Sequence, residues 1–408
     1  MYQSIVVYSA IASVASLFLN KNGLQPLSIF AFLLSLPLIA LRISQDRRLI
    51  TPVIALTAFF LSVKITEITH GGNGFNLTVL DAPSRHLVAA GLFVVVASSS
   101  FSRKYLWYAC WIASLTSFVM ACFHIRFIDP AWLGSFRYVI LGSQSWTLGV
   151  QAFATIAFLV SGITLLTPNS LLDTLSKRIL WSLAFVAGIA AAALSGTRAP
   201  FIAAPLLLAL YVWINRKSAR RCLVVSALLI MAIVTGSVID PSSRLESKFN
   251  IIQSEIECYF TTNRACGSVG SRLHLYHGGL LAFFDKPLLG HGMDSSKVIG
   301  ELIDTQRIGP IPRFENFHND FIQIAVTQGV LGLAPFLFML YYFFKSSVSI
   351  DGQRHQELQI STIWIVGLIV ITSMTQINFD RTSTTSAFIV LLALFHASSR
   401  KPDQPRVP

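Results

Sequence analysis

Charged side chains are scarce in this chain, and several other features are missing from it. Only 12% of the 408 residues are Asp, Glu, Lys or Arg, whereas a soluble domain carries about 25%. The five cysteines and nine histidines show none of the usual zinc-site spacings, and no repeat or low-complexity tract is evident. This composition excludes a secreted disulfide scaffold, a disordered chain, a coiled coil and a nucleic-acid-binding domain.

Long apolar runs take the place of the missing charge. Hydrophobic residues make up 53% of the sequence and the mean hydropathy is +0.63. A run of roughly 18 apolar residues is long enough to cross a bilayer as a helix. The sequence therefore predicts an all-α integral membrane protein with about twelve transmembrane helices. The predicted spans are Ser4–Leu19, Leu24–Leu41, Leu49–Val63, Leu87–Ser99, Tyr105–Phe123, Trp146–Leu166, Ile179–Leu194, Pro200–Ile214, Leu223–Val238, Phe321–Phe344, Ile360–Ile377 and Thr384–His396.

Basic residues predict how these spans are oriented, because cytoplasmic loops carry the excess of Lys and Arg. One set of alternate loops holds sixteen basic residues, and the short loops of the other set hold seven. The segment 239–320 contains eight basic and ten acidic residues. We therefore expect both termini in the cytoplasm and this long loop in the periplasm, with the net charge of +12 mainly reflecting topology.

The predicted division of the chain follows from these spans. Residues 1–238 hold spans one to nine, 239–320 form a large periplasmic loop with amphipathic helices, 321–396 hold spans ten to twelve, and 397–408 are a cytoplasmic tail. The first apolar segment lacks a basic n-region and a small-residue cleavage site, so we interpret it as a retained span and not as a signal peptide. Cys258 and Cys266 both lie in the large loop, where an oxidising compartment permits a disulfide; two free thiols are the alternative.

Arg198 is the first candidate site residue. It stands between Gly196 and Pro200, which break the helices on both sides, and no acidic residue lies between Asp173 and Asp240. An arginine at the membrane surface without a local partner is costly unless it meets an anion, and its forked guanidinium suits phosphate oxygens. The simpler interpretation is an arginine that extends to lipid headgroups.

Arg272 is the second candidate. Ser271 is a plausible N-cap for an amphipathic helix that runs to Phe284, which would place Arg272 in the first turn. A cation there opposes the helix dipole, unless the helix N-terminus and the guanidinium face an anion together. An exposed arginine at the end of a surface helix explains the pattern equally well. His274 and His277 should point to different faces of this helix.

His318 is the third candidate. The polar segment 314–320 directly precedes a long apolar run, which places His318 at the outer membrane interface. In the first turn of a helix its ring would stay neutral, and a neutral imidazole could accept a proton from a hydroxyl while Glu315 or Asp320 orients its other nitrogen. The alternative is an interfacial histidine that caps a helix.

Other polar groups give weaker signals. The segment 70–74 is rich in glycine but lacks the Lys and Ser or Thr of a phosphate loop, so we interpret it as a flexible external turn. Arg126 at the end of the fifth span and Arg381 in the last external turn could support the site from a second layer of residues, or form plain interfacial ion pairs.

Taken in order, several of these motifs resemble those of the O-antigen ligase and polymerase family. The motifs are Ser-Gly-Thr-Arg198, a long loop with Ser-Arg272, the segment from Pro287 to Gly292, and His318-Asn319 followed after nine residues by Gly329-Val330-Leu331-Gly332. The resemblance covers the second half of the chain, about residues 195–344. One departure is Tyr276, because the ligase pattern has leucine four residues after the loop arginine.

The resemblance implies a fold like that of C-type glycosyltransferases and a glycosyl-transfer reaction at the periplasmic face of a bacterial inner membrane. It implies transfer of a polysaccharide from undecaprenyl diphosphate to a sugar hydroxyl of lipid A–core, with no metal or other cofactor. In that reaction Arg198 and Arg272 would bind the diphosphate, His318 would act on the acceptor hydroxyl, and Tyr276 and Asn319 would contact substrate. The expected partners are the lipid-linked donor, the lipid A–core acceptor and membrane lipids.

Three other functions compete with this one. An O-antigen polymerase is the closest alternative, although the external segment 124–145 is short for a second arginine-rich site. A protein O-oligosaccharyltransferase would differ in its acceptor. A transporter could bind an anionic solute between Arg198 and Arg381, but transporters often show repeated halves and midplane charges, and neither is visible here. A structural scaffold without catalysis is a further alternative.

Overall fold

The computed structural model describes residues 2–18, 24–72, 77–123, 149–195, 197, 199–216, 245–262, 265–348 and 356–400. The regular structure of this part of the chain is helical. Eight of its helices are long and apolar enough to cross a membrane, and three shorter apolar helices accompany them. The apolar helices are α1 (Tyr2–Ala15), α2 (Leu24–Gln45), α3 (Ile50–Thr69), α4 (Leu77–Ser98), α5 (Lys104–Phe123), α7 (Val150–Leu165), α8 (Leu175–Leu194), α9 (Ala204–Asn215), α14 (Asp320–Val348), α15 (Gln356–Ser373) and α16 (Thr382–Ser399).

These helices confirm the predicted all-α integral membrane fold. Eleven of the twelve predicted spans coincide with them. The ninth, Leu223–Val238, lies outside the described residues, so the total of twelve and the predicted domain boundaries remain predictions.

Helix α16 forms the centre of the bundle. Every residue from Thr384 to Ser399 is buried, and the helix packs mainly against α4 and α15. Small residues allow close approach elsewhere in the bundle, as expected where lipid supplies no hydrophobic driving force between helices. For example, a Cβ on Gly188 of α8 would lie 2.7 Å from the Ser161 Cβ of α7, and the Ser161 hydroxyl donates to the Phe185 carbonyl at 2.8 Å.

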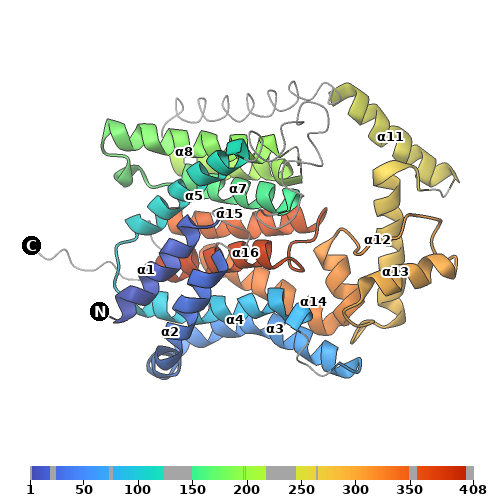
Figure 1. Ribbon diagram of the computed structural model, residues 1–408, viewed down its shortest axis with the longest axis horizontal. Coiled ribbons are helices and arrows are strands. Elements are labelled where there is room, and N and C mark those ends of the chain that lie inside the picture. Colours follow the sequence, from blue (N-terminus) through green and yellow to red (C-terminus); the bar gives the residue numbers. More distant parts are fainter. Residues whose placement is uncertain are drawn as a thin grey trace, which may run out of the picture.

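Three helices stand outside this bundle: α11 (Leu245–Thr262), α12 (Gly267–Asp285) and α13 (Ser295–Asp304). Figure 1 shows them at one end of the bundle, opposite the end at which α1 begins, with α12 running across the direction of the membrane helices. The long loop and the N-terminal helix end thus lie on opposite sides of the membrane domain. The predicted topology, with this loop in the periplasm and both termini in the cytoplasm, stays a prediction.

Helix α14 is broken at Gly329, whose φ of 61° and ψ of −154° are not helical. A break frees backbone donors and acceptors that lipid cannot satisfy, and the segment 287–292 satisfies them here. The bonds run from Val330 N–H to Pro287 O at 2.8 Å, from Leu331 N–H to Leu288 O at 3.1 Å, from His291 N–H to Val326 O at 2.8 Å, and from Gly292 N–H to Thr327 O at 3.0 Å. These hydrogen bonds hold the segment 287–292 of the large loop against α14.

We expect Gly329→Ala to loosen this junction. An added Cβ would lie 2.5 Å from the backbone of Leu288, at a φ that side chains rarely adopt. The strain should lower the free energy of unfolding by about 1–3 kcal/mol, measured as a lower melting temperature in nanodiscs. Gly300→Ala in α13 is the matched control, because nothing lies within 4 Å of its added Cβ. Equal melting temperatures for the two variants would contradict the expectation.

Candidate active site

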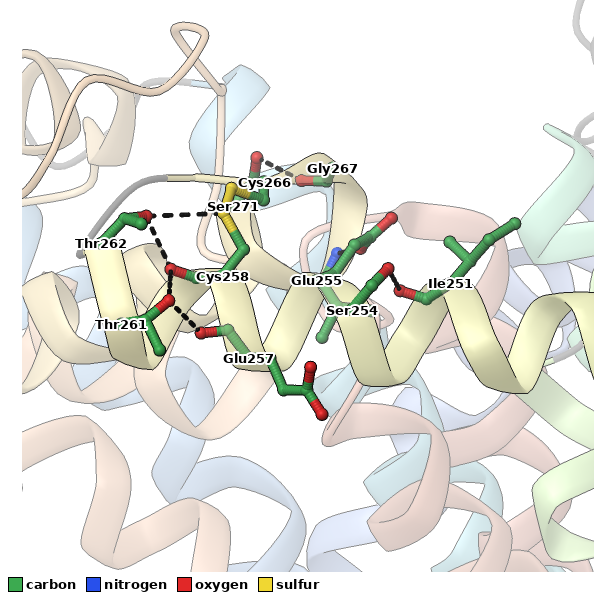
Figure 2. Close-up of a disulfide and its surroundings, with 11 residues drawn as sticks. Ile251, Ser254, Glu255, Glu257, Cys258, Thr261, Thr262, Cys266, Gly267 and Ser271 are labelled. Atoms are coloured by element: carbon green, nitrogen blue, oxygen red, sulfur yellow. Dashed lines mark hydrogen bonds between the residues drawn. A yellow bond between two sulfur atoms is a disulfide. The ribbon is translucent and has the colours of Figure 1, made fainter.

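A disulfide between Cys258 and Cys266 joins α11 to α12 (Figure 2), which confirms the predicted bridge. The two Cα atoms lie 6.1 Å apart. A second link comes from Glu255 of α11, whose carboxylate accepts the Val269 N–H at 2.7 Å in the first turn of α12. The two helices therefore form one unit, which positions the start of α12.

This unit corrects the prediction for Arg272. Helix α12 begins at Gly267, whose φ is +71°, and Ser271 donates to the Gly267 carbonyl inside the helix at 2.8 Å. Arg272 therefore lies in the second turn and not the first. Because the Glu255 carboxylate occupies the first turn, the helix N-terminus and Arg272 do not form a joint anion site. Arg272 must attract an anion by its own charge.

His318 lies just before α14 and not in its first turn. Asn319 caps that helix, since its side-chain oxygen accepts the Ile322 N–H at 3.1 Å. His318 itself has a φ of 52°, a left-handed conformation that is uncommon for residues other than glycine. The conformation turns the chain sharply at the helix entrance. The half-buried His318 ring packs edge-on against the Phe314 ring, with 5.4 Å between the ring centres.

Tyr276 connects α12 to this turn. Its hydroxyl lies 3.4 Å from the His318 carbonyl and 3.1 Å from the Met374 carbonyl. The Asn319 amide donates to the same Met374 carbonyl at 3.2 Å. Arg272 lies one helical turn before Tyr276, on the same side of α12. Hydrogen bonds thus hold α12, the histidine turn and the loop after α15 together.

Asp320 fixes the loop between α15 and α16. Its buried carboxylate accepts the Ser373 hydroxyl at 2.7 Å, the Asn378 N–H at 3.0 Å and the Phe379 N–H at 3.1 Å. Among the hydrogen bonds of the described residues, none joins the His318 ring to Asp320 or to Glu315. The suggestion that one of these carboxylates orients the imidazole finds no support in this geometry, and Asp320 instead supports the backbone near the site.

Arg381 follows this loop and directly precedes α16. Thr382, the first residue of α16, donates to Asp81 of α4, and Asp81 also pairs with Arg85 at 2.6 Å. These contacts hold the start of α16 against α4. The exposed Arg381 side chain comes close to the start of α7, since a Cβ on Gly149, which precedes that helix, would lie 3.5 Å from Nη1 of Arg381.

Arg272 and Arg381 both influence the pKa of His318. Burial lowers the pKa of the His318 imidazole below its usual value, and the Arg272 and Arg381 guanidinium groups lower it further. Burial raises the pKa of the Tyr276 phenol, whereas Arg272 opposes that rise. Two cations from distant parts of the sequence therefore act on one imidazole, which they help to keep neutral.

Little negative charge opposes these cations. The salt bridges within the described ranges join other residues, and none includes Arg272 or Arg381. Acidic groups do approach the site: burial raises the pKa of the Asp380 carboxyl, Arg381 opposes that rise, and Glu315 adds to it. Even so, two guanidinium groups without a bound carboxylate suit an anionic ligand with several oxygens.

Two predicted site residues cannot be placed. Arg198 and Arg126 lie outside the described residues, so their roles stay predictions. The expected divergence of the two neighbouring histidines is confirmed: His274 is buried against the Tyr259 ring, with 4.8 Å between the ring centres, while His277 is exposed.

His70 and Met374 are two participants that the sequence did not reveal. His70 Nε2 lies 3.2 Å from the Gly290 carbonyl, so at least this end of the glycine-rich segment, interpreted above as a flexible turn, contacts the large loop. Met374 takes part through its backbone carbonyl, and a backbone contact leaves no signal in the residue type. Histidine next to glycine could have suggested the first contact.

No cluster of three or more His, Cys, Asp or Glu side chains suited to a metal ion occurs in the part of the chain that the structure describes. The candidate site consists of two arginines, a histidine and a tyrosine, on segments held together by Asn319 and Asp320. Such a site can bind an anion and accept a proton.

Comparisons with known proteins give this site a context. The sequence model of the O-antigen ligase family matches residues 183–337. A Haemophilus influenzae protein described as uncharacterized is 22% identical over 81% of this chain and 79% of its own length. A putative polysaccharide ligase of Rickettsia conorii is 28% identical over 35% of each chain. An O-antigen ligase of Escherichia coli is 26% identical over 43% of this chain and 42% of its own.

Arg272 and His318 lie inside the matched segment, and Arg381 lies beyond it. The chain spans 35% of the length of the Rickettsia conorii ligase and 42% of the length of the Escherichia coli ligase.

Proposed function

We propose that this multi-pass membrane protein is a polysaccharide ligase, because residues 183–337 match the sequence model of the O-antigen ligase family. In this proposal it transfers O-antigen polysaccharide from undecaprenyl diphosphate to a sugar hydroxyl of lipid A–core. The reaction takes place at the periplasmic face of the bacterial inner membrane, and both chain termini lie in the cytoplasm. The observation that carries the proposal is that the Tyr276 hydroxyl and the Asn319 amide hold α12, the His318 turn and the loop after α15 together.

The two arginines bind the diphosphate of the donor. A guanidinium donates in a planar fork that matches phosphate oxygens, and it keeps its charge at any physiological pH. As the bond between the anomeric carbon and the phosphate oxygen breaks, negative charge grows on the diphosphate. Arg272 and Arg381 stabilise that charge where it develops, and Arg198 is expected to join them.

His318 acts on the acceptor. Its neutral ring accepts the proton of the attacking hydroxyl, while the acceptor oxygen bonds to the anomeric carbon and undecaprenyl diphosphate departs with the electron pair of the broken bond. The two cations favour the neutral ring before the reaction. After proton transfer, the imidazolium stands beside the negative leaving group, which stabilises it.

We expect Arg272→Ala to lower transfer by roughly 100-fold or more, the usual cost of removing a charge-stabilising group. The assay uses the purified chain in nanodiscs with lipid-linked glycan, lipid A–core and EDTA. Arg307→Ala is the matched control, because this arginine lies in the same loop but pairs at the surface with Asp285 and should keep nearly full activity. Equal rates for both variants would remove Arg272 from the mechanism.

The same assay separates the competing functions. Attachment of glycan to the core supports the ligase. Longer lipid-linked glycans without use of the core support the polymerase, and attachment to protein instead of the core supports the oligosaccharyltransferase. Solute flux without either product supports a transporter. Transfer that requires metal, and so stops in EDTA, would contradict the metal-independent mechanism.

A further inference from the structure

Helix α12 carries an exposed apolar stripe. Tyr276, Leu280 and Phe284 follow one another at four-residue spacing, which places them on one side of the helix. Leu280 is 52% exposed and Phe284 is 72% exposed. Leu288 and Leu289, just after the helix, are also exposed, at 71% and 43%. We refer to Leu280, Phe284, Leu288 and Leu289 as the α12 stripe. Large apolar side chains with this exposure rarely face water together.

The α12 stripe faces away from α13. Gly278 lies on the opposite side of the helix, about 200° from Leu280 at 100° per residue. There it meets α13 and the segment after it, since an added Cβ would lie 3.1 Å from Leu302 and 2.8 Å from Ile308. Tyr276 lies on the same side of α12 as the stripe, and its hydroxyl lies 3.1 Å from the Met374 carbonyl in the loop after α15.

The stripe is continuous with the apolar surface of α14. The carbonyls of Pro287 and Leu288 bond to the N–H groups of Val330 and Leu331, so Leu288 and Leu289 lie beside the membrane-spanning part of that helix. Val330 is 44% exposed. Further along α14, the exposed apolar residues are Leu337, Phe338, Tyr341, Phe344 and Val348. These side chains suit lipid, and the stripe extends their surface to α12.

We propose that the α12 stripe inserts into the bilayer leaflet nearest the candidate site, and that the acyl chains of ordinary membrane lipids cover it. Helix α12 then lies in the membrane interface, as amphipathic helices do when one face is buried among acyl chains. Its orientation across the direction of the membrane helices suits this placement (Figure 1). Arg272, two turns before Leu280, is thereby held at the level of lipid phosphates.

This proposal depends on the membrane placement of the chain and not on glycan transfer. The donor's polyprenyl tail has similar chemistry and could occupy the same stripe. Continuity with the lipid-facing surface of α14 favours bulk lipid, because the stripe extends away from Arg272 and His318 along the outside of the bundle. A test must therefore distinguish the two occupants and must have a readout other than activity.

The test places a fluorescent label on the stripe. In a chain with Cys110, Cys122 and Cys222 changed to Ser, Phe284→Cys and, separately, Leu280→Cys are labelled with an environment-sensitive nitrobenzoxadiazole dye. The disulfide stays intact, and the labelled chain is placed in nanodiscs. Glu301→Cys on the exposed face of α13 is the matched control. Quenching is measured with lipids that carry a doxyl group on the acyl chain and, separately, with iodide in the water.

We expect doxyl lipids to quench both stripe labels several-fold more strongly than the control label, and iodide to show the opposite order. Stripe labels that behave like the control would overturn the proposal. A polyprenyl diphosphate without glycan is then added. Loss of the doxyl quenching on this addition would overturn the choice of bulk lipid and assign the stripe to the donor's tail; unchanged quenching supports bulk lipid.

Discussion

Replacing His318 by Asn should lower glycan transfer by about 10²–10⁴-fold, the range found when a general base is removed. Asn tolerates the left-handed backbone that His318 adopts, with its φ of 52°, so the turn before α14 should keep its shape. The variant therefore removes the imidazole and little else. Transfer rate is measured in nanodiscs, with the melting temperature as the control for folding. Near-normal transfer by this variant would exclude His318 as the base.

The pH profile tests the same role more sharply. A base must be neutral, so the rate should fall as the pH drops through the pKa of His318. Burial, Arg272 and Arg381 all lower that pKa. This fall in rate, the acid limb of the pH profile, should therefore lie below the ordinary histidine pKa of about 6.5. Arg272→Gln removes one of these cations, and the limb of its residual activity should move to higher pH. A limb that stays in place would show that the ring does not sense Arg272.

Hydropathy predicted the membrane helices because each of them depends on residues that are contiguous in the sequence. The same holds for His318, whose place follows from the apolar run that begins directly after it. The disulfide could be predicted for a similar reason, since Cys258 and Cys266 are separated by only seven residues. Features that one segment determines alone can be inferred without coordinates.

The errors and omissions arise where distant segments meet. Ser271 resembles an N-cap, but Glu255 from another helix supplies the carboxylate at the true start of α12. Asp320 lies two residues after His318 in the sequence, yet its carboxylate accepts the N–H groups of residues 378 and 379. The break at Gly329 lies inside a long apolar run. Its role becomes visible only in the structure, where the segment 287–292 bonds to backbone groups on both sides of the break. Local pattern carries no information about such partners.

Asp320 should therefore be nearly as sensitive to mutation as His318, although for a different reason. Asp320→Ala leaves a hydroxyl and two backbone N–H groups buried without an acceptor, at about 1–3 kcal/mol for each unsatisfied group. The loop after α15 should loosen and displace Arg381. We expect a lower melting temperature and a large loss of transfer. Ser373→Ala removes only one of the donors to Asp320 and serves as the mild control, with a small loss of either quantity.

The residual activity of Asp320→Ala also separates two roles for this carboxylate. If Asp320 positions Arg381, its loss moves a cation away from His318, the pKa of the ring rises, and the acid limb moves to higher pH. If Asp320 instead stabilised the imidazolium directly, its loss would lower that pKa and move the limb to lower pH. The hydrogen bonds from Ser373, Asn378 and Phe379 favour the first direction. A shift to lower pH would make Asp320 the partner of the base, and full activity at an unchanged melting temperature would deny it either role.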